Sequence, residues 1–214
     1  MTSSASAEGT GIAAEPANEQ EQPDRRTRHR NRRRDQVYAA AIDLFIERGF
    51  DNATMDDIAE RADVARATVF NYFTRKTTFL EEWTTRRRQR AAVAAREKAL
   101  ANTSLSKILE RYVMEMARLS EGNREETVAL MDACLLNTNL LAHPALGHEL
   151  AGFIRDAQVA GDVASEVNPE QAGVLIAISY FAVLAQWIEH TPAPFDLEKE
   201  LLSMLDLVMY GIFN

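Results

Sequence analysis

From Val37 onward, apolar residues recur at the three- and four-residue spacing of amphipathic helices, and no segment shows the alternation typical of a half-buried strand. Glycine and proline mark the helix boundaries. Gly49, Gly122 and Gly161 each follow an apolar stripe, and Pro169 occupies a position suited to the first turn of a helix. The sequence therefore predicts an all-α fold of about nine helices.

Composition places the chain among ordinary globular proteins. Its 214 residues are 46% hydrophobic and 26% charged, which is enough apolar surface for a sizeable core. Cys134 is the single cysteine, so a disulfide framework is excluded. The first residues lack the basic and then apolar layout of a secretory signal, which predicts a cytoplasmic protein.

Charge is distributed unevenly, although the net charge is −8. Residues 1–22 carry four acidic and no basic side chains, residues 23–90 carry 16 Lys/Arg and 11 Asp/Glu, and residues 91–214 carry 8 and 17. A basic segment joined to an acidic remainder indicates one part that meets a polyanion and another part with a different task.

The amino-terminal segment divides in two. Residues 1–24 contain almost no large apolar side chain, which predicts a disordered tail. Residues 25–34, RRTRHRNRRR, hold seven arginines in ten positions. Taken alone, this run is equally well explained as a solvated tail or as an arm that contacts a polyanion.

An apolar run from Ala172 to Ile188 comes close to the length of a membrane span. It has 17 residues, includes Ser179 and Gln186, and is flanked by glutamates rather than by basic anchors. A spanning helix needs about 20 apolar residues, so we expect a buried helix and no membrane partner.

Two short helices with a tight turn between them are predicted at residues 54–73. Thr54 precedes two aspartates and is a suitable N-cap for the first helix, whose apolar positions include Ile58 and Ala59. Asp63 and Val64 form the turn before the second helix, at residues 66–72. This spacing indicates a helix-turn-helix.

The wider segment AAAIDLFIERGFDNATMDDIAERADVARATVFNYFTRKTTFL resembles the DNA-binding domain of the TetR family of transcriptional regulators. The resemblance implies an N-terminal three-helix helix-turn-helix domain at residues 35–80. It also implies a C-terminal helical domain at residues 81–214 that binds an effector and forms the dimer. The arginine run at residues 25–34 then becomes an arm for the adjacent minor groove.

The same resemblance implies the DNA contacts, because the N-terminal residues of the second helix of such a motif reach base edges. The expected base contacts are Arg66, Ala67 and Thr68. The expected phosphate contacts are Thr54, Asn71, Tyr72 and Lys76. The expected arm contacts are Arg28, Arg30, Arg32, Arg33 and Arg34.

Three positions depart from the family pattern. Asp63 replaces the turn glycine, Ala65 replaces the serine that caps the second helix, and Phe70 replaces a frequent tyrosine. Loss of a cap or of a neutral hydrogen bond weakens a contact by about 1 kcal/mol. We expect Phe70 and Phe73 to be core residues. The departures leave an alternative open, in which a dimer of this fold has lost DNA binding and acts as a protein-interaction module.

For the acidic half, the resemblance implies a small-molecule effector and a homodimer. Pocket candidates mix aromatic surface with a few polar tips, and the alternative for each is a plain core residue: Tyr112, Met116, Met131, Cys134, Phe153, Tyr180 and Trp187. The expected dimer contacts are Leu175, Ala182, Leu201, Leu205 and Val208. Few charges lie on the inward stripes, so we expect an uncharged or largely apolar effector.

Catalysis is not expected. The sequence has neither a phosphate-cradling glycine loop nor a nucleophile elbow. His143, His148 and Glu149 are poorly placed to bind a metal together, because a spacing of five residues puts the two histidines on different helix faces. We therefore expect no cofactor, no metal and no enzymatic activity. The resemblance instead implies a repressor that its effector releases from a pseudo-palindromic operator.

Overall fold

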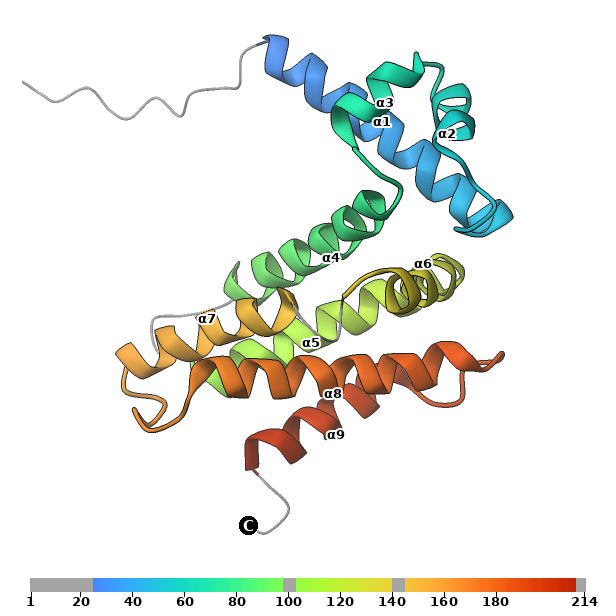
Figure 1. Cartoon of the computed structure of the whole chain (residues 1–214). Coiled ribbons are helices and arrows are strands. Elements are labelled where there is room, and N and C mark those ends of the chain that lie inside the picture. Colours follow the sequence, from blue (N-terminus) through green and yellow to red (C-terminus); the bar gives the residue numbers. More distant parts are fainter. Residues whose placement is uncertain (1–24, 98–102, 140–144, 211–214) are drawn as a thin grey trace, which may run out of the picture.

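The computed structural model describes residues 25–97, 103–139 and 145–210, and these residues form nine helices and no strand. The predicted all-α fold is confirmed. Three helices lie together at one end, and a fourth leads from them to the remaining five (Figure 1). The helices are α1 (Arg25–Arg48), α2 (Met55–Arg61), α3 (Arg66–Tyr72), α4 (Thr77–Glu97), α5 (Leu105–Gly122), α6 (Arg124–Asn137), α7 (Ala145–Val159), α8 (Pro169–Glu189) and α9 (Leu197–Tyr210).

The arginine run at residues 25–34 is the first part of α1 and not a separate arm before it. The predicted start of this helix near residue 35 was wrong by about three turns. Arginine is a good helix former, and no glycine or proline interrupts the run, so the helix continues outward from its buried half. Residues 1–24, predicted to be a disordered tail, lie outside the described residues.

Aromatic side chains hold α1–α3 against the start of α4. Phe73 stacks on Phe79 with ring centroids 4.0 Å apart, and Phe45 meets Phe79 edge to face at 6.0 Å. Val69 of α3 and Ile58 of α2 are completely buried beside them. This core fixes α3 to its two neighbours, and the prediction that Phe73 is a core residue is confirmed.

Two turns in this domain require unusual backbone conformations. Gly49 ends α1 with φ = 79°, a left-handed conformation that glycine adopts without steric cost. Asp63, between α2 and α3, has φ = 50°, and aspartate tolerates this region better than most residues do. The predicted turn at Asp63 is therefore confirmed.

The helix α4 belongs to both halves of the molecule. Its first turns complete the core of α1–α3, and the rest packs on α5 and α6. The boundary expected between residues 80 and 81 thus falls inside a continuous helix. The same helix therefore contributes to the packing of both halves.

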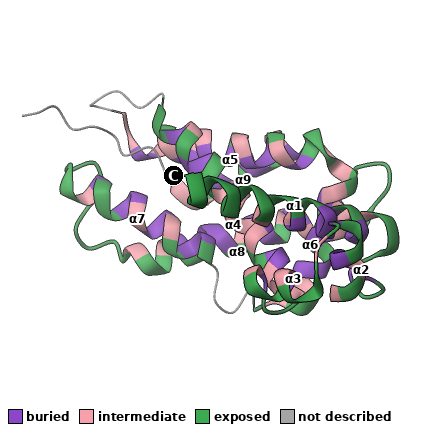
Figure 2. Cartoon of the chain, turned by 90° about the horizontal axis from the view of Figure 1, so that it is seen from above, coloured by how far each residue is buried: buried purple, intermediate pink, exposed green. Residues whose placement is uncertain are grey.

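In the larger half, α7 and α8 cross very closely. A Cβ atom added to Gly173 of α8 would come within 2.3 Å of the carbonyl oxygen of Gly147 on α7. Buried residues gather where the two helices meet (Figure 2). Among the described helices, α8 alone is long and apolar enough to cross a membrane. One stripe of α8 packs on α6, α7 and α9, while its opposite side is exposed, so the predicted buried helix is buried on one face only.

Candidate nucleic-acid interface and ligand domain

Thr54 caps α2 in the predicted way and does so reciprocally. The Thr54 hydroxyl accepts from the backbone N–H of Asp57 at 3.1 Å, and the Asp57 carboxylate accepts from the backbone N–H of Thr54 at 2.8 Å. Hydrogen bonds from the hydroxyl and then the backbone of Thr54 hold the pKa of Asp57 below its ordinary value. This capping box holds the first turn of α2, and Thr54 at the N-terminus of the helix is exposed.

One face of α3 is exposed, and we call it the recognition face. It consists of Arg66, Ala67, Phe70 and Asn71, which are neighbours at helical spacing. The prediction that Phe70 is a core residue was wrong, since its side chain is 37% exposed. Phe70 follows Arg66 by four residues and Ala67 by three, and this spacing could have placed it on the recognition face.

The other residues predicted for α3 lie partly inside. Thr68 and Tyr72 are half-buried, because they turn toward the side of the helix that contains Val69. The N-cap position of α3 is Ala65, which makes no side-chain capping bond. Because Ala65 stands where the family has a serine, the first turn of α3 has no side-chain cap.

Arg66 is exposed and already has two partners on the protein. Its Nε lies 3.1 Å from the carboxylate of Asp56, and its guanidinium lies 5.4 Å from the centre of the Phe70 ring. An ion pair so exposed contributes about 0–1 kcal/mol. A stronger bidentate partner, such as the edge of a guanine, can displace it.

Lys76 has a role that the sequence did not suggest. Its ammonium donates to the carbonyl oxygens of Phe50 at 2.5 Å and Ala53 at 3.0 Å, and it lies over the Phe50 ring at 4.3 Å. These bonds tie the loop between α1 and α2 to the start of α4. We therefore regard Lys76 as a positioning residue for Thr54, and its contact with phosphate stays a prediction.

Arg34 also differs from the expectation. The four arginines Arg28, Arg30, Arg32 and Arg33 are exposed on the outer part of α1. Arg34 instead turns toward α4 and donates two hydrogen bonds to Glu82, at 2.8 and 2.7 Å. The structure thus pairs the charge of Arg34 with Glu82 at a partly exposed position, and its contact with DNA stays a prediction.

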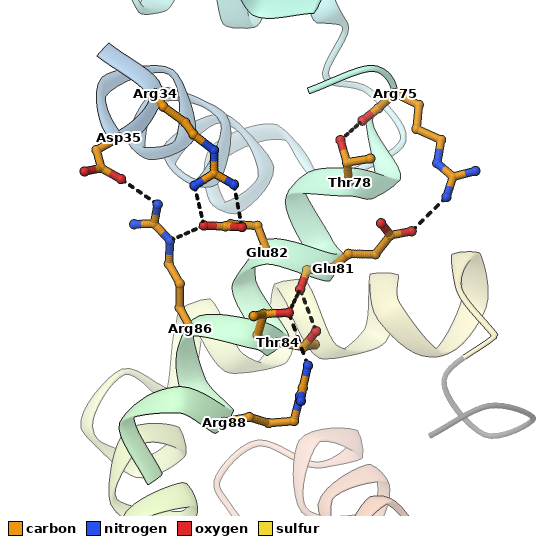
Figure 3. Close-up of polar contacts among 10 residues, drawn as sticks. Arg34, Asp35, Arg75, Thr78, Glu81, Glu82, Thr84, Arg86 and Arg88 are labelled. Atoms are coloured by element: carbon orange, nitrogen blue, oxygen red, sulfur yellow. Dashed lines mark hydrogen bonds and ion pairs between the residues drawn. The ribbon is translucent and has the colours of Figure 1, made fainter. Parts of the chain in front are cut away.

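Arg34 and Glu82 are half of a four-residue network that we call the α1–α4 clamp (Figure 3). Arg86 donates to Glu82 at 2.7 Å and to Asp35 at 2.5 Å, and its guanidinium lies 4.0 Å from the centre of the Tyr38 ring. The hydrogen bonds from Arg34 and then from Arg86 hold the pKa of Glu82 below its ordinary value. The clamp joins the arginine-rich helix to the helix that enters the larger half.

The seven predicted pocket residues are all buried in the larger half. Tyr112 and Phe153 meet edge to face at 5.8 Å. Cys134 lines a small cavity of about 200 Å³ at α4 and the end of α6. The hydroxyls of Tyr112 and Tyr180 are buried and have no hydrogen-bond partner in the described part of the chain.

A much larger cleft, of about 1340 Å³, opens between α4 and α5, and we call it the α4–α5 cleft. The sequence analysis did not predict this cleft, although the run of arginines in α4 pointed to it. These arginines have separate roles in the structure. Arg86 belongs to the clamp, Arg88 pairs with Glu149 at 2.8 Å, and Arg87 and Arg90 line the cleft.

Two of the predicted dimer contacts are corrected by the structure. Leu201 and Leu205 of α9 are buried within the chain, because this stripe of α9 packs on α5 and α8. Val208 is half-buried. Leu175 and Ala182 lie on the exposed side of α8, and Leu175 is 54% exposed.

No group of three His, Cys, Asp or Glu side chains capable of holding a metal occurs in the described ranges. His148 lies 3.6 Å from Glu170, and Glu149 pairs with Arg88. His143 lies outside the described residues.

Comparison with known proteins agrees with this arrangement. The family model described as "Bacterial regulatory proteins, tetR family" matches residues 37–83. The "Probable acrEF/envCD operon repressor" of Escherichia coli (strain K12) is 23% identical over 188 residues, which cover 82% of this chain and 84% of the relative.

Solved structures share the fold over most of the chain. The Thermus thermophilus FadR repressor, described as in complex with lauroyl-CoA, has a TM-score of 0.69 and 26% identity over 85% of this chain and 95% of that one. FadR from Bacillus subtilis, described as in complex with stearoyl-CoA, has a TM-score of 0.60 and 18% identity over 83% and 98%.

Proposed function

Because the chain belongs to the TetR family of transcriptional regulators, we propose that it is a homodimeric repressor that binds a palindromic operator and leaves it when a small-molecule effector binds. The observation that carries this function is the recognition face of α3. An exposed helical face with an arginine near its N-terminus, fixed on a rigid aromatic core, is what a major groove accepts.

On this proposal, the recognition face reads bases and its surroundings hold the backbone. Arg66 donates to a guanine, while Ala67 and Thr68 contact neighbouring base edges. Thr54, Asn71 and Tyr72 contact phosphates, as do the arginines of the outer α1 helix. Phe70 adds apolar contact, which suits a thymine methyl group. Lys76 holds the loop between α1 and α2 in position, and Arg34 holds α1 against α4.

The dimer is proposed to form through the outer faces of α8 and α9. The exposed apolar residues Leu175 and Ile178 of α8, with Leu207 and Tyr210 of α9, offer apolar surface that a second copy of the chain can cover. Pairing these faces with a second copy gives a four-helix bundle with an isologous interface. A two-fold dimer presents two recognition helices to two symmetric half-sites, hence the palindrome.

The effector is proposed to bind in the larger half. The buried candidates around Tyr112, Phe153 and Tyr180 are apolar except for their hydroxyl tips, which favours a largely apolar molecule. The similar Thermus thermophilus repressor, described with lauroyl-CoA, supports a ligand with a long apolar part. We infer further that the protein acts in the cytoplasm, where the DNA is, and that it performs no catalysis.

One observation favours a second candidate function. Ala65 gives α3 no side-chain cap, so the recognition helix begins less firmly than a serine would allow. A dimer of this fold that no longer binds DNA and serves as a protein-interaction module would tolerate that loss.

Two measurements separate the two functions. Bound duplexes are selected from random DNA, and the most enriched duplex is then titrated with the protein at several salt concentrations. A repressor selects a palindrome, and its affinity for that palindrome falls steeply with salt. The selected duplex then serves as the assay in which candidate effectors are tested for release. A folded, dimeric protein that enriches no sequence would contradict the proposal and favour the interaction module.

A further inference from the structure

The α4–α5 cleft is lined by three arginines that take part in no ion pair within the described residues. They are Arg87 and Arg90 of α4 and Arg111 of α5. Arg87 is only 7% exposed, and burial lowers its pKa. It donates to the carbonyl oxygen of Leu119 at 3.2 Å and to the Ser120 hydroxyl at 2.5 Å. The guanidinium of Arg87 is therefore held in place by neutral acceptors, with no carboxylate in ion-pair contact in the described ranges.

Two of these arginines also have donors without an acceptor. Arg87 Nε and Arg111 Nη1 are buried and have no hydrogen-bond partner among the residues that the structure describes. In the described part of the chain, every buried side-chain nitrogen or oxygen without a partner belongs to an arginine or a tyrosine. A buried donor left unpaired costs about 1–3 kcal/mol, more for a charged group. Both guanidinium groups therefore keep a donor that no acceptor in the described part of the chain uses.

The glutamates that line the cleft are largely engaged elsewhere. Glu82 is bound by Arg34 and Arg86, Glu115 by Arg118, and Glu126 accepts from the indole of Trp83 at 2.6 Å. Glu97 and Glu198 also line the cleft. The three arginines therefore face a space in which most of the carboxylate oxygens already have donors.

The cleft also has an apolar wall. Val93 of α4 is 53% exposed and Met114 of α5 is 39% exposed, and both line the cleft beside the half-buried Leu119. Apolar side chains on two neighbouring helices that face one common space suit the apolar part of a ligand. The same cleft thus offers cations and apolar surface together.

We propose that the α4–α5 cleft binds an amphipathic acid, a molecule with a carboxylate or phosphate group and an apolar part. Arg90 and Arg111 hold the acidic group with Arg87 behind them, and Val93 and Met114 contact the apolar part. The inference rests on the proposed function only in taking this acid as the effector. It places the effector in the α4–α5 cleft instead of among the buried residues around Tyr112 and Phe153, none of which line this cleft. It also replaces the expected uncharged effector with one that is largely apolar but acidic at one end.

The position of the cleft allows a bound ligand to affect the DNA-binding domain without touching the recognition face. Tyr38, Glu82 and Arg86 line one end of it, and the last two belong to the α1–α4 clamp. Arg90 lies one helical turn from Arg86 on α4, so an acid held by Arg90 also attracts the Arg86 guanidinium and competes with Glu82 for it. The ligand thereby biases how α1 is held against α4, with no need for contact with the recognition face.

Isothermal titration with decanoate, decyl phosphate and decan-1-ol tests the site directly, because the three share one chain and differ in the head group. We expect saturable binding of at least one acid to the full-length protein and binding at least tenfold weaker for the alcohol. Arg90→Met, an exposed substitution, is expected to weaken acid binding at least fivefold, and Arg90→Met with Arg111→Met at least tenfold. Arg96→Met is the matched control, since Arg96 is an exposed arginine of α4 that lies over Phe153 instead.

The outcomes are distinct. Equal binding of acid and alcohol, unchanged acid affinity in the Arg90 variant, equal losses in the Arg96 control, or no binding of either acid would each overturn the proposal. Which acid binds more tightly assigns the head group as carboxylate or phosphate. Release of the selected operator by the acid tests its role as effector. If no operator can be selected, the proposed function fails, while the titrations still decide the site.

Discussion

Arg34 on α1 and Glu82 on α4 are joined by two parallel hydrogen bonds of 2.8 and 2.7 Å, although 48 residues separate them in the chain. Arg86 extends this pair to Asp35, so the clamp joins α1 of the DNA-binding domain to α4, the helix that enters the ligand domain. Such a bidentate pair fixes an orientation as well as a distance.

Replacing Glu82 with glutamine is expected to lower the free energy of unfolding by about 1 kcal/mol, because the pair is partly exposed and solvent screens it. Two arginines would then face one neutral amide. Chemical denaturation at neutral pH measures the change. Glu81→Gln is the matched control, since Glu81 is an exposed neighbour bonded to Arg75, and an equal loss there would argue against the clamp.

The stabilisation by Glu82 is expected to depend on pH in one direction. Because the pKa of Glu82 is lowered in the folded protein, the stabilisation is fully present above its ordinary value of 4.5 and is lost as the pH falls through the folded value. The difference in stability between wild type and Glu82→Gln should therefore be constant near neutrality and shrink in acid. A difference that grew with acidification would contradict this assignment.

Arg66→Ala is expected to relax base preference at one position in each half-site, with a loss of about 1–3 kcal/mol for the preferred base. Competition between the selected operator and its single-base variants measures this. Arg61→Ala serves as a control, because Arg61 is an exposed arginine of α2 paired with Glu47. A uniform loss on all sequences would make Arg66 a phosphate contact.

The outer arginines of α1 are expected to act through phosphate. Changing Arg28, Arg30, Arg32 and Arg33 to glutamine should flatten the log–log salt dependence of operator affinity by about 3–4 units per subunit. Arg34→Gln should leave that slope almost unchanged, since Arg34 is already paired with Glu82. An unchanged slope in the fourfold variant would show that this part of α1 is solvated and does not reach DNA.

Leu175→Glu is expected to give monomers in sedimentation experiments, because it places a charge in the proposed α8 interface. Leu201→Ala is expected to leave the dimer intact and to cost about 2–5 kcal/mol of folding stability, since Leu201 lies in the core of one chain. If Leu175→Glu sediments as a dimer, the interface lies elsewhere.

Cys134 is expected to resist thiol reagents in the folded protein. Burial raises the pKa of its thiol to about 12, so almost no thiolate is present near neutral pH. Absorbance of a released chromophore at pH 8 should show little labelling until denaturant is added. Rapid labelling of the native protein would indicate that the small cavity beside Cys134 opens readily.

The sequence by itself determined the features that depend on neighbouring residues. The cap at Thr54, the turn at Asp63, the missing cap at Ala65 and the proline at the start of α8 are settled within a few positions of the chain. Local hydrogen bonds and backbone sterics decide them, so periodicity and capping rules were sufficient. The resemblance to the TetR family was carried by this same segment.

Only the tertiary structure decided which partner each face meets. Apolar periodicity showed that Leu175 and Leu201 each lie on a stripe that avoids water, but not whether their own chain or a second copy covers it. Charge likewise did not reveal that Arg34 is paired with Glu82 while Arg32 and Arg33 form no ion pair within the described residues. The sequence shows that a helical face is apolar or charged and therefore needs a covering surface or a counter-charge. Which residues supply that surface or charge depends on packing between segments far apart in the sequence.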